Sequence, residues 1–195
     1  LWALTGGRFP LAIGVLQVLA LDIGTDMLPA LALGAEPANP RVMTGRRASS
    51  VVDRGLLLRA FAVLGATEAL VSMVAFTVVL RSGGWTWGAR PSHALLALAS
   101  GTAFAAISVG QMANAFACRS NSRPVWRLRL TGNRLVLAAV AAEIVLLMAF
   151  LGVPVIRDQL GGSWPSWTGW SLALVAAVAV VVVDGLSKGI RARRR

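Results

Sequence analysis

The chain has 195 residues, of which 56% are hydrophobic and only 14% are charged. An ordinary soluble domain carries about 25% charged residues, so this composition excludes one. The large apolar fraction also excludes a disordered chain. A net charge of +11 would indicate nucleic-acid binding in a soluble protein, so the positions of the charges decide what they mean.

Five apolar windows make up most of the chain, and each approaches the length of about 20 residues that a helix needs to cross a bilayer. Alternation of apolar and polar residues with period two, typical of a membrane barrel, does not occur in them. The sequence therefore predicts an all-α protein of the cell membrane, with the lipid bilayer around it. Residues 1–195 form one domain, with transmembrane helices at about 11–35, 56–80, 93–118, 135–156 and 167–183.

The basic residues are distributed unevenly between the two ends of these helices. The segments after the first and third windows and the C-terminal tail hold 15 of the 19 Lys and Arg residues. Because positive charge is retained on the cytoplasmic side, this pattern predicts an outside N-terminus and a cytoplasmic C-terminus. The basic segments are interpreted as topology signals that contact lipid headgroups, and no nucleic-acid partner is expected. A start outside leads us to expect at least one further helix upstream of Leu1.

The first window contains two carboxylates, Asp22 and Asp26, with Thr25 beside them. Their spacing of four places both on one helix face. Each charged Asp at a helix centre costs about 2.5–3.5 kcal/mol on insertion scales, so the pair indicates a positive partner. Carboxylate and hydroxyl oxygens are ligands of hard cations, and Gly24 and Pro29 are expected to loosen the helix. The alternative is a pair of protonated, hydrogen-bonded structural carboxyls.

The other polar residues within the windows leave two interpretations open. Glu68 and Glu143 are single acids in apolar surroundings, and each fits an ion pathway or helix packing. Gln111 and Asn114 face the same way and fit either a site or an interhelical hydrogen bond. Asp184 lies four residues before Lys188, which predicts a local ion pair at a helix end.

Several motifs resemble one family. The stretch from Gln17 to Pro40 resembles the sixth transmembrane helix and following loop of cation-transporting P-type ATPases, and it reads QVLALDIGTDMLPALALGAEPANP. Sodium-potassium pumps carry a similar run, Asp-Leu-Gly-Thr-Asp-Met-x-Pro. Residues 111–116 resemble the eighth helix, and residues 184–195 resemble the basic close of the tenth. The five windows thus resemble helices six to ten of the calcium and sodium-potassium pump branch.

The resemblance implies a set of cation ligands. In the family, residues that match Asp22, Thr25 and Asp26 coordinate the transported cation. The position of Gln111 also contributes in calcium pumps, where it is an acid, and the position of Asn114 is an acid in sodium pumps. The predicted ligands of the transported cation are therefore Asp22, Thr25, Asp26, Gln111 and Asn114. The cation itself is left open among Ca²⁺, Na⁺, K⁺ and Mg²⁺.

The family's phosphorylation motif, Asp-Lys-Thr-Gly-Thr, does not occur in these residues, nor do its nucleotide-binding domain and helices one to five. The resemblance implies that ATP and Mg²⁺ bind only in a complete parent pump, whose missing N-terminal helices and cytoplasmic domains are the expected partners. This chain alone is not expected to hydrolyse ATP. It is interpreted as the C-terminal membrane part of a cation pump, whose segment 36–54 faces the phosphorylation domain. The alternative is a free-standing accessory membrane protein or a remnant of a truncated pump gene.

Overall fold

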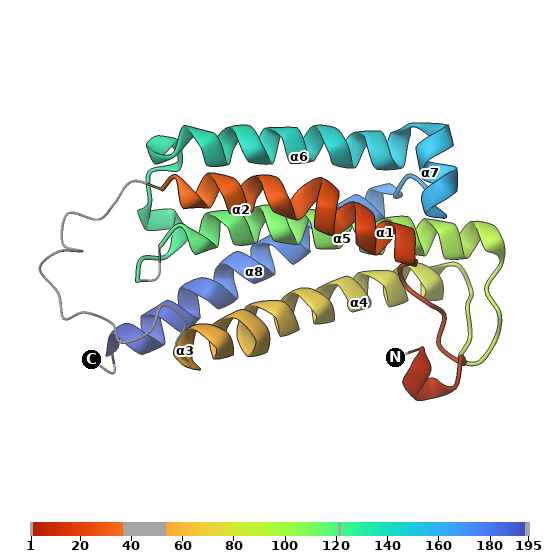
Figure 1. The fold of residues 1–195 in the computed structure, drawn as a ribbon. Coiled ribbons are helices and arrows are strands. Elements are labelled where there is room, and N and C mark those ends of the chain that lie inside the picture. Colours follow the sequence, from red (N-terminus) through yellow and green to blue (C-terminus); the bar gives the residue numbers. More distant parts are fainter. Residues whose placement is uncertain (1, 37–53, 121, 194–195) are drawn as a thin grey trace, which may run out of the picture.

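The computed structural model describes residues 2–36, 54–120 and 122–193, and these are mostly helical (Figure 1). Five of the described helices are long and apolar enough to cross a membrane. They are Val15–Gly34, Arg54–Ser82, His93–Cys118, Arg134–Gly152 and Trp167–Arg191. The prediction of an all-α membrane protein with five spans is confirmed.

Two of the five spans change their helical geometry along their length. The first consists of α1 (Val15–Leu19), the π-helix η2 (Ala20–Asp26) and α2 (Met27–Gly34). The second consists of α3 (Arg54–Leu57), the π-helix η4 (Leu58–Gly65) and α4 (Ala66–Ser82). The remaining helices are α5 (His93–Cys118), α6 (Arg134–Gly152), the short α7 (Pro154–Leu160) and α8 (Trp167–Arg193). Three short 3₁₀ segments lie at Ala3–Thr5, Val125–Arg127 and Leu130–Gly132.

Local capping sets helix ends that differ from the apolar windows. The first helix begins at Val15 because Gly14 is extended and donates its N–H to Gln17 Oε1 at 2.9 Å. The fourth ends at Gly152, where the chain becomes extended before a proline that starts α7. The fifth continues to Arg193, ten residues beyond the predicted end.

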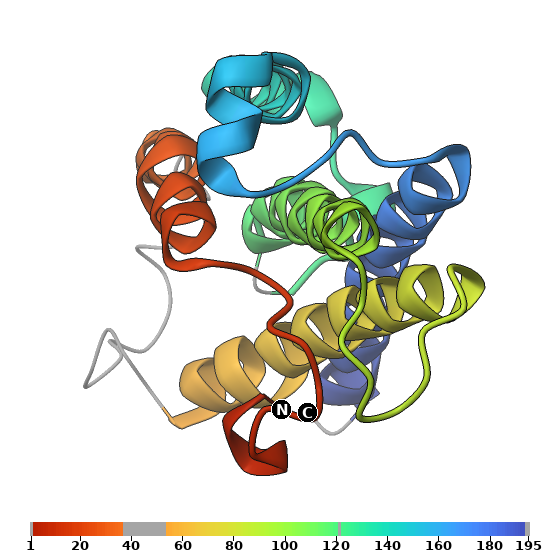
Figure 2. The same cartoon turned by 90° about the vertical axis from the view of Figure 1, so that its right-hand side faces the viewer.

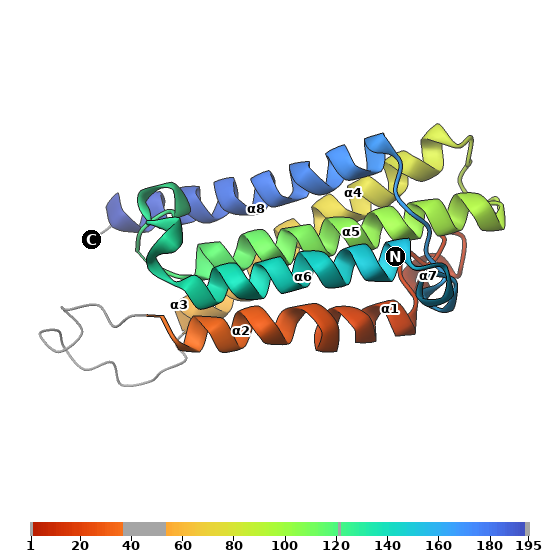
Figure 3. The same ribbon diagram turned by 90° about the horizontal axis from the view of Figure 1, so that it is seen from above.

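Helix α5 is the centre of the bundle, and it is the most buried of the five spans. It packs mainly against α8 and α4, and on its other side against α6 and the first span. The end-on view shows the other spans around it (Figure 2), and α2 and α8 lie at opposite margins with α5 and α6 between them (Figure 3). The two termini lie toward opposite ends of the bundle (Figure 1), as an odd number of spans requires. The basic starts of α3 and α6 lie at the end that the sequence predicts to be cytoplasmic.

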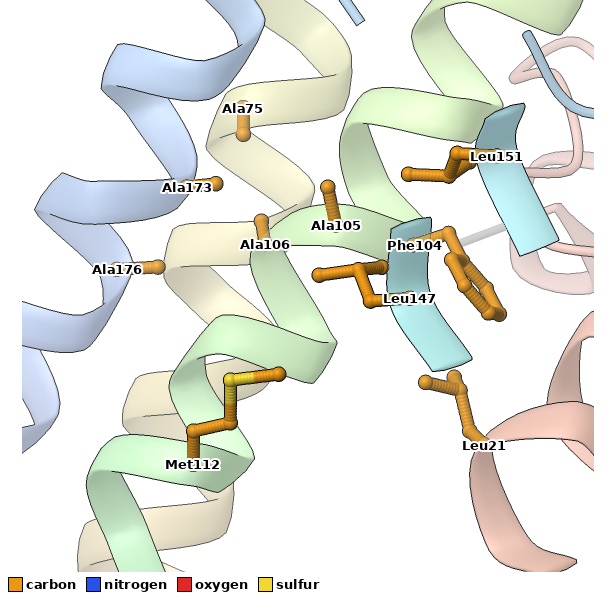
Figure 4. Packing of buried hydrophobic residues seen from close by; sticks show 10 residues of the cluster. All are labelled: Leu21, Ala75, Phe104, Ala105, Ala106, Met112, Leu147, Leu151, Ala173 and Ala176. Atoms are coloured by element: carbon orange, nitrogen blue, oxygen red, sulfur yellow. The ribbon is translucent and has the colours of Figure 1, made fainter. Parts of the chain in front are cut away.

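Small side chains allow close packing at the core. Alanines from α4, α5 and α8 meet on one side of the central helix, while larger residues of α5, α6 and η2 fill the other (Figure 4). Without a strong hydrophobic drive in lipid, such small residues let helices approach and gain dispersion energy. The alanines are Ala75, Ala105, Ala106, Ala173 and Ala176.

A close approach at Gly101 of α5 leads to the first prediction. A Cβ atom there would lie 1.9 Å from the carbonyl oxygen of Ser163, in the backbone between α7 and α8. We expect Gly101→Ala to lower the free energy of unfolding of the full natural protein by about 1–3 kcal/mol, because the crossing backbone has to move away. Thermal unfolding in detergent, followed by tryptophan fluorescence, measures this.

Gly189→Ala is the matched control for this substitution. It lies in α8, and its added Cβ atom would meet nothing within 4 Å. We expect this variant to leave the midpoint of thermal unfolding unchanged or to raise it, since alanine favours the helix over glycine. Equal midpoints for the two variants would show that the backbone contact at Gly101 does not limit packing.

Candidate functional site

The first span departs from α geometry at the predicted carboxylates. Residues Ala20–Asp26 form a π-helix, a geometry that is rare and often occurs at functional sites. The predicted loosening around Gly24 therefore takes the form of a wider helical turn, and the helix stays continuous through Pro29. A Cβ atom at Gly24 would lie 2.9 Å from the ring of Phe150, so glycine permits α6 to approach this turn.

Thr25 and Asp26 of this turn meet Gln111 of α5. The Gln111 amide donates from Nε2 to Asp26 Oδ2 at 3.1 Å. Thr25 is fully buried; its hydroxyl donates to the Leu21 carbonyl at 2.7 Å and lies 3.5 Å from Gln111 Oε1. The structure thus brings together three of the five predicted ligands.

Asn114 joins this group through a shared pocket. The pocket has a volume of about 320 Å³ and lies between the first span, α4 and α5. The Asn114 amide oxygen also lies 3.5 Å from the sulfur of Cys118, the last residue of α5. The lining residues are Asp26, Pro29, Ala30, Leu33, Glu68, Gln111, Asn114, Ala115 and Cys118.

Asp22 lies elsewhere. It is exposed on the first span and is not part of the pocket lining. Its charge is nevertheless close enough to interact with that of Asp26. The two carboxylates therefore share a helix region, while only one of them faces α5.

Two acids outside the predicted ligand set lie near this pocket. Glu68 of α4 lines it directly. Glu143 of α6 is completely buried, neither of its carboxylate oxygens has a hydrogen-bond partner among the described residues, and it lies within electrostatic range of Asp26 and Glu68. Both are acids within apolar windows, which is the signal that the sequence offers. The sequence does not show toward which neighbouring helix each acidic side chain points.

These groups supply oxygen ligands from several helices, but only part of a coordination shell. No three His, Cys, Asp or Glu side chains of the described residues lie close enough together to hold a metal ion by themselves. Hard cations take six or more oxygens, including amide and backbone carbonyls. The pocket offers the carboxylates of Asp26 and Glu68 and the amide oxygens of Gln111 and Asn114.

Comparison with known families decides the assignment of the chain. Residues 10–190 match the family described as "Cation transporting ATPase, C-terminus". The chain belongs to this family. It is accordingly a multi-pass membrane protein, and its five spans are the C-terminal membrane region of a cation-transporting P-type ATPase.

Individual members of the family agree with this. The chain is 30% identical over 173 residues to calcium-transporting ATPase 1 of Lactococcus lactis. The matched region covers 86% of this chain and 18% of that relative. The chain is 31% identical over 85 residues to the human sodium/potassium-transporting ATPase subunit alpha-3, covering 42% of this chain and 8% of the relative. The chain therefore spans less than a fifth of the length of these pumps.

The chain has a polar network where the ends of its first, third and fourth spans meet. Arg119, just after α5, donates to Glu36 from Nη2 at 3.0 Å and from Nε at 3.1 Å. Asn133, the N-cap of α6, donates to Glu36 at 2.8 Å and to the Ala32 carbonyl at 3.0 Å. Glu36 therefore fixes the point where the predicted cytoplasmic segment 36–54 leaves α2; residues 37–53 of that segment lie outside the described residues.

This network predicts a pH dependence of stability. The hydrogen bonds from Arg119 hold the pKa of the Glu36 carboxyl below its ordinary value of 4.5, although partial burial opposes this, and Asn133 lowers the pKa further. A lowered pKa in the folded state stabilises the fold above the unfolded value and loses this effect as the pH falls through the folded value. We expect Glu36→Gln to lower the midpoint of thermal unfolding at pH 7, and the difference from the wild type to shrink as the pH falls below about 4.5.

Thermal scans between pH 7 and pH 3.5 measure the difference between the two proteins. Asp158→Asn is the control, since the Asp158–Arg157 pair is exposed and such pairs contribute about 0–1 kcal/mol. A difference for Glu36→Gln that persists unchanged at pH 3.5 would contradict the role of the ionised carboxylate.

The predicted pair of Asp184 and Lys188 is confirmed, with Nζ 2.5 Å from Oδ2. The structure adds a third member, because Arg59 of η4 lies 2.5 Å from the other carboxylate oxygen. Both cations also donate to the carbonyl of Ala117 near the end of α5. This buried network joins the second, third and fifth spans.

Proposed function

We propose that this chain is the C-terminal membrane part of an ATP-driven cation pump and supplies part of its intramembrane cation-binding site. The observation that carries this proposal is the convergence of Asp26, Gln111 and Asn114, from two spans, on one pocket. Thr25 supports the arrangement through its contact with Gln111. A carboxylate and amide oxygens suit Ca²⁺, Na⁺, K⁺ or Mg²⁺ rather than softer metals.

We propose that Asp22 binds the cation together with helices from the rest of the pump. Its exposure leaves its carboxylate accessible to such helices, and its charge interacts with that of Asp26. The matched region is only 18% of the calcium-transporting relative, and the rest of such a pump has room for those helices. The complete protein then holds the cation between this chain and its N-terminal membrane part.

ATP and its Mg²⁺ bind, in this proposal, to cytoplasmic domains of the complete pump. Phosphorylation there shifts the helices between two arrangements, and the pocket opens to one side of the membrane at a time. Segment 36–54 faces the phosphorylation domain. The anchoring of Glu36 to Arg119 and Asn133 gives that segment a fixed base on the bundle.

Transport by the full natural protein tests this function. The protein is reconstituted into liposomes, and ATP-dependent uptake of ⁴⁵Ca²⁺, ²²Na⁺, ⁸⁶Rb⁺ (for K⁺) and Mg²⁺ is measured. We expect accumulation of at least one of these cations, coupled to ATP hydrolysis. Hydrolysis of ATP without movement of any of them would contradict the proposal.

A further inference from the structure

Glu68 brings a second carboxylate to the pocket from a helix outside the predicted ligand set. It lies on α4 and lines the same pocket as Asp26, Gln111 and Asn114. Its Oε1 atom is buried and has no hydrogen-bond partner among the described residues. A buried carboxylate oxygen without a hydrogen-bond partner has a high free-energy cost, which a bound ligand would offset.

The contact of Glu68 with α5 fixes where its carboxyl lies. A Cβ atom at Gly110 would lie 3.4 Å from Cγ and 3.6 Å from Cδ and Oε1 of Glu68. The carboxyl group therefore rests on the bare backbone of α5, one residue before Gln111. Glu68 and the Gln111 amide, which binds Asp26, line the same pocket.

The charges around the pocket are negative. Asp26 and Glu68 are close enough for their charges to interact, and both are within range of Glu143, which is fully buried with both oxygens unpartnered among the described residues. No Lys or Arg of the described residues forms an ion pair with Asp26 or Glu68. Because the pocket residues of α5 include no acid or base, the charged side chains of the pocket lining come from α4 and the first span.

We propose that Glu68 is a ligand of the transported cation and that it makes the site selective for a divalent cation, Ca²⁺. This inference rests on the proposed function. Two carboxylates facing one pocket match a charge of two, and their oxygens with those of two amides supply much of a Ca²⁺ shell. Since Coulomb energy scales with the charge of the ion, the second carboxylate favours a divalent over a monovalent cation.

Equilibrium binding to the full natural protein, without ATP, tests this. The affinity for Ca²⁺ is measured with ⁴⁵Ca²⁺, and that for Na⁺ from its competition. For Glu68→Gln we expect Ca²⁺ affinity to fall by about 30-fold, because a partly buried charge partner is lost. Na⁺ affinity is expected to fall by only about fivefold, half of the change on a logarithmic scale. Asp158→Asn, which removes an exposed carboxylate, is the matched control and is expected to change neither.

The variants separate this inference from the proposed function. If Asp26→Asn loses Ca²⁺ binding while folded Glu68→Gln binds like the wild type, Glu68 is no ligand and the proposed function stands. If Asp26→Asn also binds normally, the proposed function fails. Equal losses of Ca²⁺ and Na⁺ affinity in Glu68→Gln would assign Glu68 to helix packing and overturn the inference.

Glu68→Asp keeps the test decisive if Glu68→Gln does not fold. It retains the charge but withdraws the carboxylate by one methylene group. We expect a preference for Ca²⁺ over Na⁺ that is lower than in the wild type. An unchanged preference in this variant would overturn the inference.

Discussion

Replacement of Asp26 by asparagine is expected to lower the affinity of the full natural protein for its cation by about 100-fold. Asparagine has nearly the same size and its amide oxygen can still accept the hydrogen bond from Gln111, so the local structure is retained. The negative charge is lost, and it is the charge that offsets the dehydration of the cation. Cation-dependent formation of the phosphorylated enzyme, titrated with each cation, measures the shift.

Two further observations make the Asp26 result interpretable. Asp158→Asn removes an exposed carboxylate outside the pocket and is expected to titrate like the wild type. The midpoint of thermal unfolding of Asp26→Asn is expected to stay close to that of the wild type. A folded Asp26→Asn protein with unchanged cation dependence would contradict a role for this carboxylate in binding.

The largest loss of stability is expected from Asp184→Asn. Its carboxylate is completely buried and lies 2.5 Å from both Arg59 and Lys188. Removal of its charge leaves two buried cations facing each other, which costs about 3–5 kcal/mol. Denaturant unfolding of the full natural protein measures the change in free energy.

Lys188→Met is the informative comparison. It removes one cation but leaves Asp184 paired with Arg59, which also donates from Nε at 3.1 Å. We therefore expect it to cost less than Asp184→Asn. If Asp184→Asn were no more destabilising than Lys188→Met, the network would not hold the three spans together.

The span positions could be predicted because each span is a long apolar run in a chain of low charge. Hydropathy does not detect local capping, so two helix ends differ from the prediction. The first span begins later because Gln17 accepts a hydrogen bond from Gly14, and the fourth ends earlier because Pro154 starts a new helix. The fifth helix extends beyond its predicted end at residue 183, because Asp184 and Lys188 end the apolar run but not the helix. Their charges are satisfied inside the bundle, which allows the helix to continue.

The candidate site was predictable where its residues are neighbours in the sequence or carry a family motif. The spacing of Asp22 and Asp26 predicts a site in the first span, although only Asp26 lines the pocket, and the resemblance implies Gln111 and Asn114 on another span. The pairing of Arg59 with Asp184, 125 residues apart, depends on how η4 and α8 pack. The direction of Glu68 likewise follows from the bare surface at Gly110, which no single-helix pattern shows.

The location of the bound cation tests the central claim directly, namely that the intramembrane carboxylates bind a cation between the helices. Crystals of the full natural protein grown in Ca²⁺ are measured for the anomalous signal of calcium. We predict a peak about 2.3–2.6 Å from a carboxylate oxygen of Asp26, with Gln111 or Asn114 in the same shell. A bound Ca²⁺ that touches none of these residues, at a concentration that saturates transport, would contradict the account.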